Sequence, residues 1–346
     1  MLLRIIDAIR TLRDWAALAG ALLVFGITGN TPSWAVQSMV RLFCASGGRS
    51  NDLIARLMAA RHPPRELTET PGVLAPLSPA EAKDAGTTLA EKGYYLYRQR
   101  LSDAACDRLH QFALTHPATV RRRDGESRDT LFTIYDPARP LGVRYDFAEA
   151  DLINHPDVQA LMADPAIIAA AQAYLGTEPV VDVVAMWWNT AFSDQPDSEA
   201  AQYFHFDLDR IKWVKFFIYL TDVSSDSGPH YFIAKSHRTG GIPPALLAKG
   251  YARLTDDEVS AHFDRRDFIE FVAPRGTILA EDTRGLHKGQ NVRAGHRLVL
   301  QIQFSNSLFG PPYPRVAFNA MRDQNLATMV KRHPRMYAAY SHGAAS

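Results

Sequence analysis

The most constraining feature of this chain is a long run of β-branched and aromatic residues that follows a histidine and a carboxylate spaced two apart. The run covers residues 211–220, and His205 and Asp207 precede it. Such a run predicts a buried strand, and residues two apart in an extended chain point to the same side. An imidazole and a carboxylate on one face are two of the three ligands in a 2-His-1-carboxylate site for non-heme iron.

A histidine followed two residues later by an acid is a weak signal by itself. The pattern occurs three times, at His155/Asp157, His205/Asp207 and His262/Asp264. We expect Asp157 to be the N-cap of a helix, which would occupy its carboxylate. We expect His262 to lie near the end of a helix that starts at Thr255 and runs to about residue 263, where residues two apart face different directions. The remaining pair adjoins a predicted strand, where this spacing brings the two side chains together.

A third ligand and an anion-binding arginine follow later in the chain. His287 comes a short turn after the predicted strand 277–280, and Arg297 enters the predicted strand 298–304. No other histidine has an arginine ten residues downstream. A buried arginine needs an anion, and its planar fork suits a carboxylate. The residues therefore predict a triad that binds Fe(II), with Arg297 holding the distal carboxylate of 2-oxoglutarate and one coordination position left for O₂.

Composition narrows the class of protein without selecting a function. The chain has 346 residues, of which 47% are hydrophobic and 22% are charged, as in a soluble globular protein. Lysine and arginine number 38 against 37 acids, so charge gives no argument for nucleic acid or an acidic membrane as a partner. Cys44 and Cys106 form neither a metal-ligand pattern nor a disulfide framework, which favours a reducing, cytoplasmic setting.

The first 62 residues are predicted to be a helical extension. Apolar residues recur at helical spacing through residues 1–14, and the apolar run 15–28 that follows is, at 14 residues, short for a bilayer span. Three interpretations stay open: an extension packed on the main domain or on a second subunit, peripheral attachment to a membrane, or a cleaved targeting segment. Prolines in 63–80 indicate a linker, so we expect an oxygenase domain over 81–346 with its core at about 93–310.

The order of predicted elements favours one fold class. A helix from a capping box at Ser78 to about Lys92 leads into helices and then several strands separated by turns. The polar stretch 121–130 is expected to be a solvated loop, with an active-site lid as the alternative. Helices followed by strands favour an α+β fold around a β-sandwich or jelly roll rather than a βαβ sheet.

The motifs together resemble the phytanoyl-CoA dioxygenase-like family of Fe(II)/2-oxoglutarate-dependent oxygenases over about residues 93–310. The motifs that carry the resemblance are Gln202–Asp207, Lys215–Asp222, Ser227-Gly-Pro-His230 followed by Gly240, and Asp282–Gly289. The resemblance implies a double-stranded β-helix (jelly-roll, cupin-like) core flanked by helices. It also implies that His205, Asp207 and His287 are the iron ligands and that Arg297 anchors 2-oxoglutarate. Halogenating relatives have a small residue in place of the carboxylate, so Asp207 favours hydroxylation of a small-molecule C–H bond, with release of succinate and CO₂.

Several residues near the predicted site have weaker assignments. Lys215 shares a strand face with Trp213, Phe217 and Tyr219, and it either pairs with 2-oxoglutarate or points to solvent. Candidates for contacts to the co-substrate or the ligands are Asn189, Gln202 and Thr283, and candidates for contacts to a fairly apolar substrate are Trp187 and Tyr203. We expect His230 and His237 to be structural histidines.

Two other functions remain compatible with the sequence. One is a non-catalytic, cupin-like metal-binding protein, although a bare metal site has no use for an arginine that clamps a carboxylate. The other is an oligomerising or membrane-attached module, acting through residues 1–60, whose oxygenase domain is degenerate. Fold and triad do not select the substrate, nor whether it contains coenzyme A.

Overall fold

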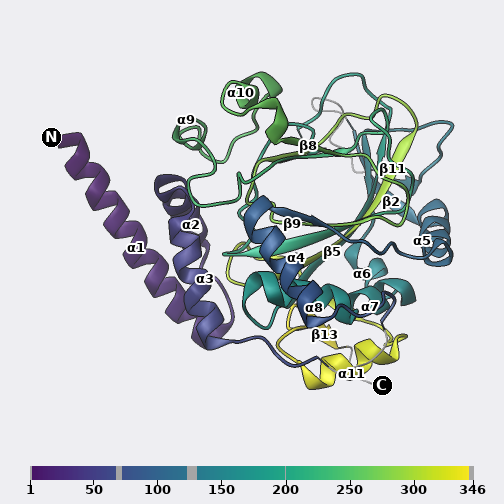
Figure 1. Ribbon diagram of the computed structural model, residues 1–346, viewed down its shortest axis with the longest axis horizontal. Coiled ribbons are helices and arrows are strands. Elements are labelled where there is room, and N and C mark those ends of the chain that lie inside the picture. Colours follow the sequence, from purple (N-terminus) through teal and green to yellow (C-terminus); the bar gives the residue numbers. More distant parts are fainter. Residues whose placement is uncertain (1, 68–71, 123–130, 199, 343–346) are drawn as a thin grey trace.

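The structure is a computed structural model that describes residues 2–67, 72–122, 131–198 and 200–342. Three N-terminal helices lie at one end of the molecule, and a larger sheet, a smaller three-stranded sheet, a two-stranded parallel pair and flanking helices form the rest (Figure 1). The expected α+β jelly-roll core with helical flanks and an N-terminal helical extension is confirmed. The domain boundaries at 62 and 80 stay a prediction, and residues 68–71 of the linker and 123–130 of the polar stretch lie outside the described residues.

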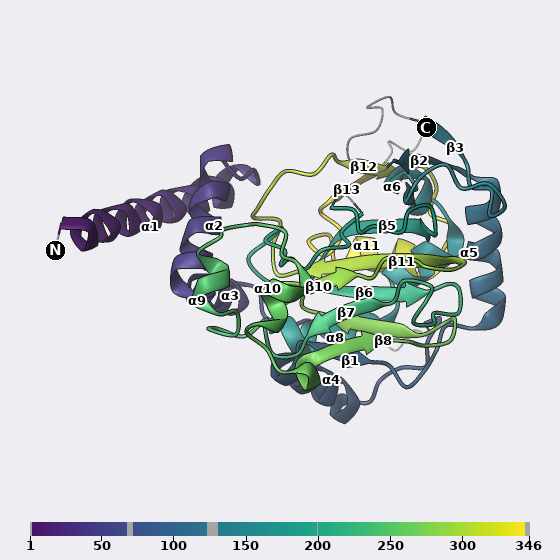
Figure 2. The same cartoon turned by 90° about the horizontal axis from the view of Figure 1, so that it is seen from above.

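The N-terminal extension consists of α1 (Leu2–Thr28), α2 (Ser33–Ser46) and α3 (Arg49–Arg61). Helix α1 projects away from the body of the molecule, while α2 and α3 lie against it (Figures 1 and 2). Leu18 and Ala21 of α1 are buried in an apolar cluster that also contains Phe43 of α2 and Phe206. The extension therefore packs on the segment that carries the predicted metal motif.

Much of α1 remains apolar and exposed. Residues 8–28 of this helix are long and apolar enough to cross a membrane by length and composition, which revises the 14-residue estimate from the sequence. The apolar run was counted from Trp15 onward, after the charged residues of the first 14 positions. In the structure, α1 is one continuous helix that includes those charged residues. The buried helical stretch Pro156–Leu175 passes the same test, so the criterion does not distinguish a membrane span from a core helix.

The larger sheet has eight strands in the order β1-β9-β6-β11-β5-β4-β2-β3. Its strands are β1 (Tyr94–Leu96), β2 (Pro117–Arg121), β3 (Leu131–Ile134), β4 (Arg144–Asp146), β5 (Val180–Thr190), β6 (Trp213–Tyr219), β9 (Ile278–Glu281) and β11 (His296–Ser305). The smaller sheet has the order β10-β7-β8, with β7 (His230–Ile233), β8 (Phe268–Phe271) and β10 (His287–Gly289). All strand pairs within these two sheets are antiparallel.

Strand β6 shows how the two faces of the larger sheet divide. Val214, Phe216 and Ile218 belong to the main apolar cluster beneath the flanking helices, whereas Phe217 and Tyr219 face the smaller sheet. The strand begins at Trp213, later than the sequence run suggested, but the predicted alternation holds. The inner face, between the sheets, is where the candidate site lies.

Helices cover the outer face of the larger sheet (Figure 1). They include α4 (Pro79–Lys92), α5 (Asp103–Thr115), α7 (Pro156–Met162), α8 (Pro165–Leu175) and α11 (Gln324–Arg332). The capping box between Ser78 and Glu81 starts α4 as predicted. Helices α4 and α8 approach closely at Gly86, where an added Cβ would lie 2.8 Å from the carbonyl carbon of Ala173. Only glycine fits this contact without a shift of the backbone.

The remaining elements are short and connect the layers. They are α6 (Glu149–Leu152), α9 (Pro244–Leu247), α10 (Asp256–Ser260), a 3₁₀ helix at Arg265–Asp267, β12 (Val316–Phe318) and β13 (Tyr340–His342). Helix α10 starts at the predicted capping box of Thr255 but ends at Ser260, so His262 lies beyond it. Helix α7 has His155, not Asp157, as its N-cap, and the Asp157 carboxylate accepts hydrogen bonds from Arg108 instead.

Candidate metal centre

The predicted triad comes together at the inner face of the fold. His205 and Asp207 lie on the segment before β6, and His287 is the first residue of β10. The backbones of His205 and His287 form a bridge, with N–H to O distances of 3.0 and 2.9 Å. Asp207 Oδ1 lies 3.7 Å from His205 Nε2, and Asp207 Oδ2 lies 3.5 Å from His287 Nε2. The three donor atoms are thus close enough to share one metal ion.

Backbone carbonyls fix the orientation of both imidazoles. The Nδ1 of His205 is 2.9 Å from the carbonyl oxygen of Tyr203, and the Nδ1 of His287 is 3.0 Å from that of Gly285. Each carbonyl accepts from Nδ1–H, so each Nε2 keeps its lone pair for a ligand bond. Burial lowers the pKa of both histidines, which holds the rings in the neutral form that binds metals.

Lys215 lies next to the carboxylate of the triad. Its Nζ donates to Asp207 Oδ2 at 2.6 Å, and it is also 3.4 Å from Asp209. Burial alone would raise the pKa of Asp207, but Lys215 and the two imidazoles outweigh it and hold that pKa well below its usual range. Lys215 is buried and points inward, not to solvent. Its contact in the structure is Asp207, and its predicted pairing with 2-oxoglutarate stays a prediction.

Arg297 is a buried cation that forms no ion pair with the described residues. Its side chain donates to the carbonyl oxygen of Gly228 and, at 2.9 Å, to Asn189 Oδ1. Its Nε is buried and has no hydrogen-bond partner among the described residues. Burial lowers the pKa of this guanidinium. A guanidinium held in this way can accept a carboxylate ligand at small desolvation cost, since it is already out of water.

One cavity of about 190 Å³ connects the triad to Arg297. Trp187 and Lys215 line it as predicted, together with Phe217 of β6 and Gln301 of β11. The remaining lining includes Arg144, His230 and Gly289. A metal ion at the triad and an anion at Arg297 would therefore occupy the same cavity.

Four predicted contact residues do not line this cavity. Asn189 Oδ1 accepts hydrogen bonds from both Arg297 and Trp187 Nε1, so it holds two side chains that line the cavity. The Thr283 hydroxyl accepts from Trp213 Nε1, while its carbonyl accepts from the backbone N–H of Asp207. Gln202 accepts from the backbone N–H of Asp197, and Tyr203 contributes the carbonyl that orients His205. Asn189 thus holds Arg297, and Thr283 and Tyr203 hold the ligand residues, whereas the contact of Gln202 is to Asp197.

The sequence interpretation missed a buried pair beside the triad. His230 Nε2 lies 3.0 Å from Glu281 Oε1, and both side chains are buried. Burial raises the pKa of Glu281 to about 8 and lowers that of His230 to about 3, so the pair is neutral. Glu281 directly follows the predicted strand 277–280, and two-residue alternation with Leu279 would have placed it inward. His230 is thus a buried, hydrogen-bonded core histidine, as expected, and it also lines the triad cavity.

Comparison with known protein families gives a match for this chain. Residues 89–297 match the family described as phytanoyl-CoA dioxygenase (PhyH). The chain belongs to this family. The expected membership among the Fe(II)/2-oxoglutarate-dependent oxygenases is thereby confirmed, and with it the class of cofactors. Comparison with curated proteins found no match.

Solved structures with a similar arrangement share little sequence with this chain. They include the epimerase SnoN in complex with Fe3+, alpha ketoglutarate and nogalamycin RO, at 16% identity and a TM-score of 0.45, covering 66% of this chain and 84% of that one. EctD from S. alaskensis with bound Fe has 19% identity and a TM-score of 0.45, with coverage of 73% and 88%. HygX from Streptomyces hygroscopicus with nickel and 2-oxoglutarate has 14% identity and a TM-score of 0.45, with coverage of 67% and 90%. These likenesses are too distant to carry a residue-level argument.

The residues of this chain fit the cofactors of its family. Two neutral imidazoles and one ionised carboxylate match the ligand preference of Fe(II). Arg297, with its unpartnered Nε, matches the need of a dicarboxylate co-substrate for a cation at its far end. The cavity joins the two features.

Proposed function

We propose that this protein is an Fe(II)- and 2-oxoglutarate-dependent dioxygenase that hydroxylates a C–H bond of a small molecule, releasing succinate and CO₂. The observation that carries the proposal is the buried, uncompensated Arg297 in the same cavity as the triad. A protein that only stored or sensed a metal would not need such a cation. When bound, iron and 2-oxoglutarate supply the oxidising chemistry.

Each residue of the proposed site has a separate task. His205, Asp207 and His287 would hold the iron. Arg297 binds the distal carboxylate and so orients the co-substrate toward the triad. Trp187 and Phe217 provide the aromatic part of the cavity wall beside the triad.

Asp207 supports hydroxylation over halogenation, because an aspartate in the triad leaves no ligand position for a halide on that side. Lys215 supports the same outcome, since its ammonium compensates the buried carboxylate and keeps it ionised. The solved structures similar to this chain include an epimerase and a carbocyclase. The product that the enzyme forms from its substrate must therefore be identified directly. The cavity size favours a small molecule as the substrate, and its lining combines Trp187 and Phe217 with several charged side chains.

The test is formation of succinate from 2-oxoglutarate in the presence of Fe(II) and O₂. Wild type is expected to turn over slowly even without its substrate, and His205→Ala and Arg297→Ala are expected to lose this turnover. Arg332→Gln, which removes an exposed arginine of α11, serves as the matched control and should behave as wild type. Anaerobic addition of Fe(II) and 2-oxoglutarate should also produce a visible charge-transfer band. If neither ligand binds, the proposed function is wrong.

A further inference from the structure

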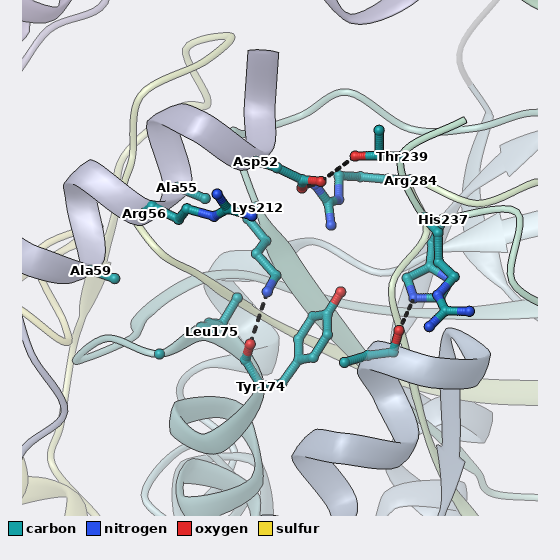
Figure 3. A pocket seen from close by; sticks show the side chains of 13 residues that line it. Asp52, Ala55, Arg56, Ala59, Tyr174, Leu175, Lys212, His237, Thr239 and Arg284 are labelled. Carbon is teal, nitrogen blue, oxygen red and sulfur yellow. Dashed lines mark hydrogen bonds and ion pairs between the residues drawn. The ribbon is translucent and has the colours of Figure 1, made fainter. Parts of the chain in front are cut away.

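A second cavity, of about 710 Å³, lies between helix α3 and the oxygenase core. Figure 3 shows its walls: Arg56 and Asp52 come from α3, and Lys212, Tyr174 and Arg284 come from the core. None of its lining residues lines the triad cavity. Because α3 precedes residue 89, one wall lies outside the stretch that matches the family. The cavity is therefore specific to the way this chain attaches its extension.

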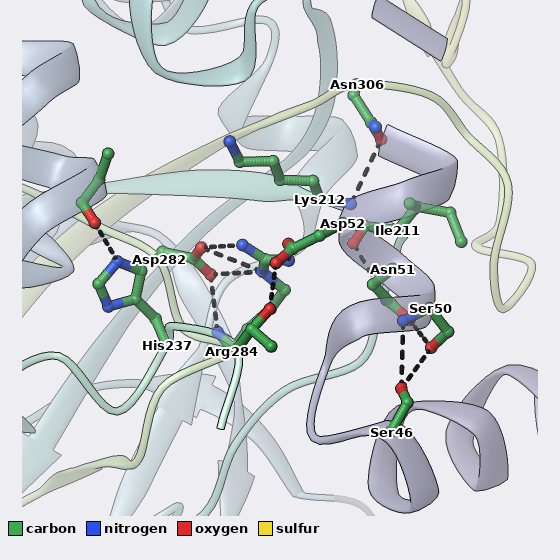
Figure 4. A network of polar contacts seen from close by, with 12 residues as sticks. Ser46, Ser50, Asn51, Asp52, Ile211, Lys212, His237, Asp282, Arg284 and Asn306 are labelled. Carbon is green, nitrogen blue, oxygen red and sulfur yellow. Dashed lines mark hydrogen bonds and ion pairs between the residues drawn. The ribbon is translucent and has the colours of Figure 1, made fainter. Parts of the chain in front are cut away.

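The extension is held firmly enough to form a permanent wall. Asn51 Nδ2 donates to the carbonyl oxygen of Ile211 at 3.0 Å, and both groups are buried. Asp52 accepts from Arg284 at 3.0 Å, which ties α3 to the segment after β9 (Figure 4). Arg284 is in turn paired with the buried Asp282 at 2.7 Å. These contacts fix the position of α3 against the core.

The same contacts leave the cavity with excess positive charge. The acid on its wall, Asp52, is engaged by Arg284 and by the hydroxyl of Thr239 (Figure 3). Lys212 donates to the carbonyl oxygen of Tyr174 at 2.9 Å and lies over that residue's ring, but no described carboxylate lies within 4 Å of its Nζ. Arg56 and Arg238 likewise form no ion pair with the described residues. Three cations thus line one concave space without an ion-pair partner among the described residues, and the carboxylate of Asp52 on the same wall is engaged by Arg284.

Part of the lining is apolar and small. Ala55 and Ala59 of α3 face Leu175 at the end of α8. The volume is within the range of cavities that hold small organic ligands and is larger than a single inorganic ion needs. Basic groups beside a small apolar surface suit a ligand with an anionic head and an organic body.

We propose that this cavity binds a phosphorylated small molecule, with its phosphate held by Lys212, Arg56 and Arg238 and its organic part against Ala55, Ala59 and Leu175. Three cations can neutralise a group with two or more charges, which a phosphate ester or a diphosphate supplies and a single carboxylate does not. Burial and the neighbouring Arg284 lower the pKa of Lys212 to about 8, so an anion at this position would restore its preference for the charged form.

The binding is tested by isothermal titration calorimetry of the full-length, iron-loaded protein with inorganic pyrophosphate as the probe. One saturable site per chain is expected. Lys212→Met and Arg56→Gln should each weaken binding about tenfold, the usual effect of removing one charge-assisted contact. Arg61→Gln, which removes an arginine that does not line the cavity from the last turn of the same helix, should leave binding unchanged.

Three outcomes would overturn the proposal. One is the absence of saturable heat, and another is equal affinity in Arg56→Gln, Lys212→Met and Arg61→Gln. Tighter binding of citrate than of pyrophosphate would show that the cavity takes polycarboxylates and not phosphates. Arg56 is exposed, so its variant should fold even if Lys212→Met does not.

A further variant separates this cavity from the proposed active site. Arg297→Ala should abolish succinate formation but leave pyrophosphate binding intact. If Arg297→Ala weakens pyrophosphate binding as much as Arg56→Gln does, the probe occupies the triad cavity and the second site is refuted. Failure of the proposed oxygenase activity, by contrast, would leave the calorimetric result unaffected.

Discussion

Arg297 of β11 and Asn189 of β5 are direct cross-strand partners, and the guanidinium donates to the amide oxygen at 2.9 Å. The same oxygen accepts from Trp187 Nε1 at 2.9 Å, so one side chain holds both the arginine and an aromatic wall of the triad cavity. The position of the predicted carboxylate anchor therefore depends on a residue that does not itself line the cavity.

Replacing Asn189 with alanine should weaken 2-oxoglutarate binding without removing the iron site. Two buried donors lose their acceptor, which costs roughly 1–3 kcal/mol, and part of that cost falls on the orientation of Arg297. We expect the Kd for 2-oxoglutarate to rise about tenfold while Fe(II) affinity is retained, measured by anaerobic titration of the charge-transfer band. Unchanged 2-oxoglutarate affinity would show that Gly228 alone positions the guanidinium.

Lys215→Met should destabilise the metal-free protein more than the metal-bound one. The substitution leaves the buried Asp207 carboxylate without its ammonium, and breaking a buried ion pair in this way costs about 3–5 kcal/mol. A bound divalent ion would supply the missing positive charge. Urea unfolding with EDTA and with Mn²⁺ should thus show a larger metal-dependent stabilisation than in wild type.

Lys331→Met, which removes an exposed lysine from α11, is the matched control for that comparison. It should change neither the free energy of unfolding of the metal-free protein nor the increase in that free energy when metal is added. An increment in Lys215→Met equal to that of the control would contradict the role assigned to the Lys215–Asp207 pair.

Phe43→Ala should connect the N-terminal extension to the metal site. The Phe43 ring stacks on Phe206 at 5.5 Å between centroids, and Phe206 stands between two of the predicted ligands. Truncating such a buried ring costs about 3–5 kcal/mol and leaves a cavity behind the ligand segment. We expect lower unfolding free energy and weaker Fe(II) binding.

The exposed Trp34 of the same extension supplies the control, since Trp34→Ala removes a large side chain that is 50% exposed. It should leave Fe(II) affinity unchanged. If Phe43→Ala also retains full Fe(II) affinity, the extension stabilises the fold without supporting the triad.

Pyrophosphate binding at the second cavity should weaken as pH rises through about 8. With its pKa at about 8, Lys212 is mostly charged at pH 7 and mostly neutral at pH 9. The other groups around it keep their charge over that interval: the Arg284 and Tyr174 pKa values are raised well above their usual ranges, and that of Asp282 is lowered. Asp52 and Arg56 complete the charged surroundings.

The measurement is the ratio of Kd values at pH 9 and pH 7, compared between wild type and Lys212→Arg. The protonation of the probe affects both proteins equally, so it cancels in the comparison. Arginine stays charged at both values, and the variant should therefore show the smaller ratio. Equal ratios would exclude Lys212 from the phosphate contacts.

The triad was predictable because its geometry depends mainly on local sequence. The spacing of two residues predicts that His205 and Asp207 point to the same side of an extended segment. His287 and Arg297 lie next to predicted strands whose turns and alternation can be recognised in the sequence. The inner face of β6 followed from the same alternation. The N-cap at His155 and the early end of α10 were mispredicted, because short-range side-chain competition at a helix end is decided by the geometry of the turn.

Other features depended on segments far apart in the chain. That His230 would pair with Glu281 followed only from the packing of the two sheets. The second cavity exists because α3 is fastened to Ile211 and Arg284, more than 150 residues later. The sequence alone indicated the candidate ligand set, the central strands β5, β6 and β11, and the family, because these depend on residue type and spacing. Tertiary structure decided which buried charges form ion pairs and which do not. The reason is that pairing depends on the distance between side chains that are far apart in the sequence, and no local sequence pattern gives that distance.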